Sequence, residues 1–158
     1  MTGTNQFLEM ISPEIQTAID EKRVLIFCMG AVEPHGPHLP TGVDIYLPLE
    51  AARRAAERVG AVVAPCTNYG YKSLPRSGGG PGFAGSLNLR GTTTIAVVCD
   101  IFAEFIRHGW RNILVLEWHL ENVAFVYEGI DEAIREASPV PRLKIVRIDD
   151  IVKLSFDP

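Results

Sequence analysis

The chain has 158 residues, of which 47% are hydrophobic and 22% charged, a composition typical of a globular protein with one domain and a sizeable core. Its formal net charge is −4 and its basic residues are scattered, which argues against a nucleic-acid partner. No apolar run approaches the roughly 20 residues that span a bilayer, and the first ten residues lack the pattern of a signal peptide.

Three cysteines, Cys28, Cys66 and Cys99, are odd in number and form no Cys-x-x-Cys pair. They indicate neither a disulfide framework nor a zinc ribbon. We therefore expect a reduced, cytoplasmic protein with no membrane and no nucleic acid among its partners.

The first half of the chain alternates helical and strand patterns. Ser12 and Pro13 predict the capped start of a short helix that runs to residue 20. Residues 23–32 are a nearly continuous apolar run, which is typical of a strand buried on both faces of a parallel sheet. Three prolines and two glycines predict a long loop over 33–44. A helix over 47–59 then ends at Gly60, and a second short strand covers 61–65.

The second half continues the alternation after a long glycine-rich loop over 66–91, a length that is usually functional or disordered in a compact domain. A helix opens at Thr92–Thr94 and runs to His108, and a third strand covers 112–118. The next helix starts at Glu121 or Asn122 and runs to about Ala137, before a fourth strand over 143–148. The last residues resemble the start of another element, so we expect a chain cut from a larger domain or an unusually short version of one.

Strands that alternate with helices imply right-handed βαβ units and a parallel sheet. We therefore expect a single α/β domain over residues 1–158, a sandwich built on a parallel sheet of at least four strands.

Histidines and carboxylates follow two of the predicted strands. Ligands bind beyond the carboxyl ends of the strands in an open parallel sheet, so both groups are expected at one edge. Imidazole and carboxylate together suit zinc, manganese or iron. The five candidate ligands exceed the three that a single catalytic zinc uses and suit two ions that share one carboxylate. These candidates are Glu33, His35, Asp44, His119 and Glu121.

Each of these features also has a simpler interpretation. A strand followed by a polar loop with Glu and His is common without a metal. His38 is a ligand, a residue beside the ligands or a solvated loop residue, of which the last two together are favoured. Trp118 lines a pocket or covers the core. The run Gly78–Gly80 lacks the spacing of a phosphate-binding loop and is better interpreted as a backbone-rich wall of a substrate pocket.

Several segments resemble the creatininase (creatinine amidohydrolase) family, over roughly residues 6–150. Residues 29–48 read MGAVEPHGPHLPTGVDIYLP and resemble its segment G-x-x-E-x-H-G-x-H-L-P-x-x-x-D. Residues 118–122 read WHLEN and resemble its second metal motif, H-x-E-N. Residues 69–89 read YGYKSLPRSGGGPGFAGSLNL and resemble the loop before its F-x-G-[ST] motif. The resemblance implies a three-layer α/β/α sandwich with a mainly parallel sheet, of which the C-terminal part is missing here.

The resemblance also implies a site and a reaction. Two divalent ions, zinc or manganese, would be held by Glu33, Asp44 and His119 and by His35, Asp44 and Glu121, with Asp44 bridging. The implied reaction opens a cyclic amide with water, which for creatinine gives creatine. Family members form ring-like homo-oligomers, commonly hexamers. The proton-transfer group would be the bound hydroxide, Glu121, His38 or a group of a neighbouring subunit. The substrate would contact Ser77, Gly78, Gly79, Trp118 and Leu120.

Three departures from the family pattern leave other hypotheses open. Glu117 and Trp118 replace an Asn-Gly pair before the ligand histidine. Leu120 replaces an aromatic residue, and Pro81-Gly82 replaces a polar pair. The chain also stops before the segment that would supply further pocket residues. A family hydrolase that acts on a different small ring, or a non-catalytic protein that binds metal or assembles, is therefore the alternative.

Overall fold

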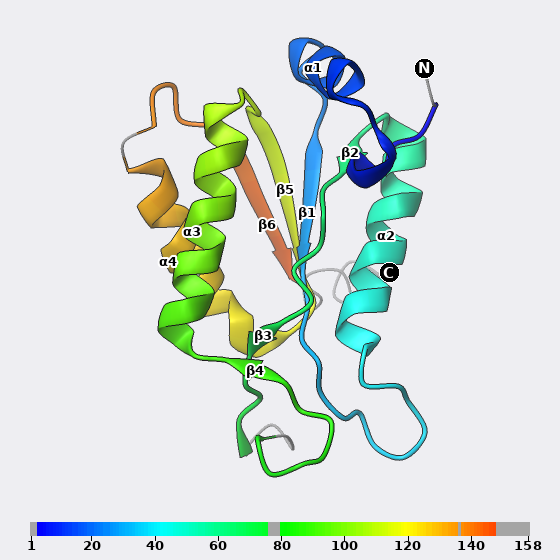
Figure 1. The fold of residues 1–158 in the computed structure, drawn as a ribbon, viewed down its shortest axis with the longest axis vertical. Coiled ribbons are helices and arrows are strands. Elements are labelled where there is room, and N and C mark those ends of the chain that lie inside the picture. Colours follow the sequence, from blue (N-terminus) through cyan, green and yellow to red (C-terminus); the bar gives the residue numbers. More distant parts are fainter. Residues whose placement is uncertain (1–2, 76–79, 136, 148–158) are drawn as a thin grey trace, which may run out of the picture.

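A four-stranded parallel sheet forms the centre of the protein, whose structure is a computed structural model that describes residues 3–75, 80–135 and 137–147. The strands are β1 (Leu25–Met29), β2 (Val62–Val63), β5 (Asn112–Glu117) and β6 (Arg142–Arg147), in the order β2-β1-β5-β6. All three pairings are parallel. The arrowheads of β1, β5 and β6 therefore point to the same end of the molecule (Figure 1).

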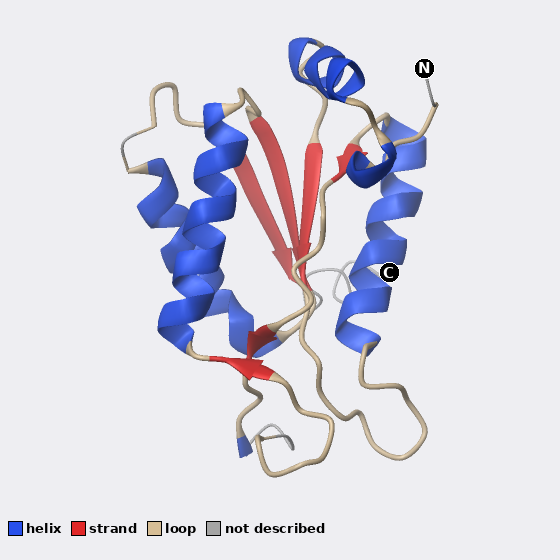
Figure 2. Ribbon diagram, viewed as in Figure 1, coloured by secondary structure: helices blue, strands red, loops and turns tan. Residues whose placement is uncertain are grey.

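Helices cover both faces of this sheet. Helix α2 (Val43–Val59) lies on one face, and α3 (Gly91–Arg107) and α4 (Val123–Ile134) lie together on the other (Figure 2). Helix α1 (Ser12–Asp20) and the short 3-10 helix η1 (Phe7–Glu9) precede β1 and lie at the end of the sheet opposite the carboxyl ends of the strands. This arrangement confirms the predicted three-layer sandwich with a mainly parallel sheet.

The alternation of side chains along β1 divides the core into two parts. Phe27 packs in the core that faces α3 and α4, where its ring meets Phe102 edge-on at a centroid distance of 5.4 Å. Ile26 and Cys28 pack against Ala52 and other side chains of α2 on the opposite face. All five residues of β1 are buried, as the apolar run predicted, so the strand is held from both sides.

Element boundaries differ from the predictions where proline and glycine dominate the sequence. Helix α2 begins at Val43, four residues earlier than predicted, so that Asp44 lies in its first turn and Pro48 lies inside it. A proline so close to a helix start removes only one internal hydrogen bond. The prediction of a loop that includes Asp44 is therefore wrong. Ser12, expected as a cap, is instead the first residue of α1.

The glycine-rich segment contains structure that the sequence did not predict. Two-residue strands β3 (Gly70–Tyr71) and β4 (Asn88–Leu89) pair in parallel below the main sheet. A 3-10 turn, η3 (Leu120–Asn122), leads from β5 into α4. These short elements lie beyond the carboxyl ends of β1 and β5, next to the polar residues that follow those strands.

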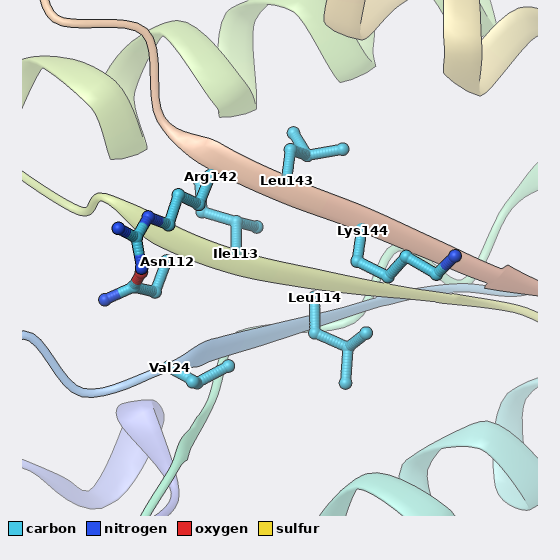
Figure 3. A pocket seen from close by; sticks show the side chains of 7 residues that line it. All are labelled: Val24, Asn112, Ile113, Leu114, Arg142, Leu143 and Lys144. Atoms are coloured by element: carbon cyan, nitrogen blue, oxygen red, sulfur yellow. The ribbon is translucent and has the colours of Figure 1, made fainter.

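The face that carries α2 is partly open. A shallow groove crosses the amino-terminal ends of the strands, where Val24, Leu114 and Lys144 extend from neighbouring strands (Figure 3). Its lining residues are Val24, Asn112, Ile113, Leu114, Arg142, Leu143 and Lys144. The groove is therefore far from the carboxyl ends of the strands, where the site is expected. None of the helices in the described part of the chain is long and apolar enough to cross a membrane.

Candidate metal centre

The polar residues that follow β1 and β5 meet at one edge of the sheet. Because β1 and β5 are neighbours, the segment with Glu33 and His35 and the turn with His119 begin side by side. Asp44 joins them from the first turn of α2, where the helix dipole favours a carboxylate. Asp44 and His119 are only 5% and 2% exposed. A pair of ionisable groups buried this deeply needs compensating partners.

Asp44 lies between two histidines, with one carboxylate oxygen facing each of them. Its Oδ2 is 3.2 Å from Nδ1 of His119, and its Oδ1 is 3.3 Å from Nε2 of His35. Glu33 lies beside both rings, with Oε1 at 3.3 Å from His119 Nδ1 and 3.6 Å from His35 Nε2. Ligand atoms of Glu33, His35 and Asp44 all lie within 4.8 Å of one another. Both carboxylates therefore lie between the two imidazole rings.

Backbone carbonyls fix which nitrogen of each ring faces the carboxylates. Nδ1 of His35 lies 3.1 Å from the carbonyl of Glu33, and Nε2 of His119 lies 2.9 Å from the carbonyl of Tyr71. A carbonyl only accepts, so both of these nitrogens carry a proton. In its neutral form each ring would therefore have its lone pair on the nitrogen that faces the carboxylates, which is Nε2 of His35 and Nδ1 of His119. Histidine ligands of metal ions are commonly oriented in this way.

The charges of the cluster shift the pKa values of its members. Burial alone would lower the pKa of His119, but hydrogen bonds to Asp44 and Glu33 raise it to about 10. Burial alone would raise the pKa of Glu33, but hydrogen bonds from His119 and Ser73 lower it to about 2. The metal-free cluster thus stabilises positive charge between its carboxylates. The residues fit a divalent cation, because they offer nitrogen and oxygen donors and an excess of negative charge.

Glu121 lies on the other side of the His119 ring. Its Oε2 is 3.7 Å from His119 Nε2, and its Oε1 accepts a hydrogen bond of 3.2 Å from the backbone N–H of Leu74. Glu121 is therefore next to the cluster but outside the group formed by Glu33, His35 and Asp44. An ion held by His35, Asp44 and Glu121 stays a prediction.

The expected substrate and proton-transfer residues are less closely associated. His38 is exposed in the turn after His35, and no hydrogen bond within the described residues joins it to the cluster. Leu120 is 55% exposed, and Trp118 is half-buried with an indole N–H that has no partner in the described part of the chain. Ser77, Gly78 and Gly79 lie outside the described residues.

Sequence reasoning from the ligand pattern missed several residues that support the cluster. Ser73 is 5% exposed, hydrogen-bonds to Glu33 and accepts a 3.2 Å hydrogen bond from the backbone of Gly80. Tyr71 contributes only its carbonyl, and Asn122 is fully buried beside Tyr71. The only signal for Ser73 and Tyr71 was the family-like YGYKS element in which both occur.

Comparison with known proteins identifies the family. The family model described as creatinine amidohydrolase matches residues 8–155, which is nearly the whole chain. The chain belongs to the creatininase family.

Two curated relatives give the creatininase match more detail. A creatinine amidohydrolase of Pseudomonas putida is 47% identical over 113 residues, which are 72% of this chain and 44% of that protein. A 3-dehydro-scyllo-inosose hydrolase of Thermotoga maritima is 27% identical over 113 residues, which are 72% of this chain and 35% of that protein. The chain therefore spans less than half the length of these two relatives.

Solved creatininase structures have the same fold. A manganese form matches with a TM-score of 0.89 and 37% identity, over 98% of this chain and 61% of that chain. A Glu-to-Gln mutant of the Zn–Zn type matches with a TM-score of 0.88 and 37% identity, with the same coverage. The Glu-to-Gln mutant complexed with creatine matches with a TM-score of 0.84 and 38% identity, over 91% of this chain and 57% of that chain.

Proposed function

We propose that this chain is a metal-dependent hydrolase that opens a cyclic amide, with creatinine as the leading substrate and creatine as the product. The observation that carries the proposal is Asp44, whose two oxygens face two differently oriented histidines. The 47% identity to a creatinine amidohydrolase supports the substrate class. The creatininase complexed with creatine, a neighbour in structure, supports a small cyclic or ring-opened ligand.

We assign two divalent ions to the cluster. Glu33, Asp44 and His119 would hold one ion, because Nδ1 of His119 already lies 3.2–3.3 Å from one carboxylate oxygen of each of the other two. His35 and Asp44 would hold the other, completed by Glu121. The manganese and Zn–Zn forms of neighbouring creatininases favour these two metals. Zinc, manganese or one of each is compatible with a set of imidazole and carboxylate donors.

Bound divalent ions would activate water and polarise the amide carbonyl. The residues of this chain would then orient the substrate and transfer a proton to the departing nitrogen. Hydrolysis adds the oxygen of water to the carbonyl carbon, breaks the ring C–N bond and delivers a proton to the departing nitrogen. Glu121 is the carboxylate that we assign to this proton transfer, because the Leu74 N–H holds its Oε1 while its Oε2 remains beside the cluster. His38 is the second candidate, provided that its turn moves toward the ring.

The walls of the pocket set the substrate. We assign Ser77, Gly78, Gly79, Trp118 and Leu120 to substrate contact, since the last two flank His119 in the sequence. Trp118 also has a buried indole N–H without a partner among the described residues, which is a donor available to a polar ring. A homo-oligomer, with a hexamer as the expected state, would allow a neighbouring subunit to complete this wall.

A second candidate is hydrolysis of a sugar-derived ring ketone by the same centre. The relative from Thermotoga maritima, a 3-dehydro-scyllo-inosose hydrolase, favours this possibility at 27% identity. The chemistry is related, because water would again add to a ring carbonyl carbon that a bound ion would polarise; here the adjacent ring C–C bond would break and the departing carbon would take the proton.

The test is turnover by protein purified without chelators and reloaded with zinc or manganese. Creatine formation from creatinine is measured before and after chelation, with Glu121→Gln as the diagnostic variant and Glu128→Gln, an exposed residue of α4, as its matched control. We expect chelation to abolish turnover and Glu121→Gln to reduce it about 10²–10⁴-fold, with no effect of the control. Turnover of 3-dehydro-scyllo-inosose alone would overturn the substrate, and two bound ions with no turnover of either ring would overturn the proposal.

A further inference from the structure

Asn122 connects three segments that surround the metal centre. Its side chain is fully buried, and its Oδ1 accepts a hydrogen bond of 2.7 Å from the backbone N–H of Tyr71 in β3. Its Nδ2 donates to the carbonyl of Gly30, after β1, at 3.1 Å and to Oε1 of Glu117, at the end of β5, at 3.3 Å. One amide thus uses both of its polar atoms to join β1, β3 and β5.

The backbone packs closely around this amide. A Cβ atom on Gly70 would lie 2.4 Å from the Gly30 carbonyl and 2.6 Å from Asn122 Oδ1. Contacts between carbon and oxygen normally begin at about 3.3 Å, so only glycine fits at position 70. The backbone at Gly30 and Gly70 therefore packs directly onto the amide and keeps it in one orientation.

Asn122 holds two of the groups that contact His119, the backbone of Tyr71 and the side chain of Glu117. The ring nitrogen Nε2 of His119 donates to the carbonyl of Tyr71 at 2.9 Å, and the backbone N–H of His119 donates to Oε1 of Glu117 at 2.9 Å. Strand β3 has only two residues, so its own pairing gives the Tyr71 carbonyl little support. The hydrogen bond from Tyr71 to Asn122 supplies that support.

We propose that Asn122 is a positioning residue of the metal centre. By holding Tyr71 and Glu117, it keeps the proton of the neutral His119 ring on Nε2 and turns Nδ1 toward Glu33 and Asp44. The part of this proposal that concerns metal affinity rests on the proposed function, whereas the orientation of the ring does not. Outer contacts of this kind typically change metal affinity 10–100-fold when they are removed.

The test compares Asn122→Ala with Val126→Ala, which truncates another fully buried side chain one turn further along α4. Two properties are measured on each folded variant: the exchange rate of the His119 Nε2–H in nitrogen-resolved NMR of metal-free protein, and the affinity and absorption spectrum of bound Co²⁺. We expect Asn122→Ala to lose the protected Nε2–H and to bind Co²⁺ 10–100-fold more weakly with an altered spectrum. Val126→Ala is expected to lower stability without changing either property. Equal behaviour of the two variants would overturn the proposal.

A second pair keeps the proposal testable if Asn122→Ala does not fold. Glu117→Gln retains an acceptor for the N–H groups of His119 and Asn122, and Glu117→Ala removes it. We expect Glu117→Gln to retain the wild-type Co²⁺ spectrum and Glu117→Ala to lose it, and the reverse order would contradict the proposal. The Nε2–H measurement needs neither metal nor substrate, so it remains decisive even if the chain hydrolyses no ring.

Discussion

Substitution of Gly30 by alanine should damage the metal centre through the backbone alone. Gly30 directly follows β1 and packs on the first turn of α2, where a Cβ atom would lie 2.6 Å from the carbonyl oxygen of Asp44. Pro48, four residues after Asp44, has no N–H to offer this carbonyl, so the carbonyl faces Gly30 instead of a helical donor. A normal contact of about 3.3 Å requires the turn to move by about 0.7 Å.

This displacement is large by the standards of metal coordination. Metal–ligand distances are maintained within about 0.2 Å, so a shift of about 0.7 Å would move the Asp44 carboxylate too far to bind the same ion as His35 or His119. We expect metal affinity to fall at least 10-fold, and the overpacked turn to reduce the free energy of unfolding by about 1–3 kcal/mol. The melting temperature should fall by about 2–4 °C for each kcal/mol.

Titration calorimetry with Zn²⁺ and thermal unfolding of the metal-free protein measure the two effects. Gly82→Ala is the matched control, because a Cβ atom there meets nothing within 4 Å, and it should change stability by less than about 0.5 kcal/mol. A folded Gly30→Ala protein that binds zinc with wild-type affinity would refute the reasoning.

Three further predictions follow from the charges of the site. Asp44→Ala should lose both ions, whereas His35→Ala and His119→Ala should each lose mainly one; elemental analysis that finds two ions in Asp44→Ala would disprove the bridging role. Burial raises the pKa of Glu117 from 4.5 to about 8, so the unfolded chain releases this proton at lower pH than the folded protein. As the pH rises from 4.5 to about 8, the free energy of unfolding of the metal-free wild type should therefore fall by about 1.4 kcal/mol per pH unit relative to that of Glu117→Gln. Denaturant titrations that find a constant difference between the two proteins over this range would contradict the prediction. Because the pKa of His119 is raised to about 10, metal must displace a proton from it. Metal affinity should therefore increase about tenfold for each unit by which the pH rises, up to about pH 10. Calorimetry at pH 8 in buffers of different ionisation enthalpy should detect the release of a proton on metal binding, and no release would exclude His119 as a ligand.

The sheet and most of the site could be predicted because their signals are local. The apolar run that became β1 and the pattern of β5 fixed two strands, and ligands beyond adjacent parallel strands must meet at one edge. Glu33, His35 and His119 were found in this way. Asp44 was predicted as a candidate ligand, but its place on a helix was missed, because the prolines and glycines before it indicated only loop.

The supporting residues could not be predicted from the same signals. Every residue has a backbone carbonyl, so nothing in the sequence shows that the carbonyl of Tyr71 is the one that accepts a hydrogen bond from His119. Its position depends on the pairing of β3 with β4, two-residue strands 18 positions apart, which carry no periodic pattern. Asn122 is the last residue of the WHLEN segment, but two of its three partners, Tyr71 and Gly30, lie 51 and 92 positions away in the sequence.

The most direct test of the account is the number of divalent ions per chain, by elemental analysis of protein purified without chelators. The opposite orientation of the two Asp44 oxygens predicts close to two ions per chain. One ion or none would contradict the dinuclear centre, because it would mean that these residues alone do not build both cation positions.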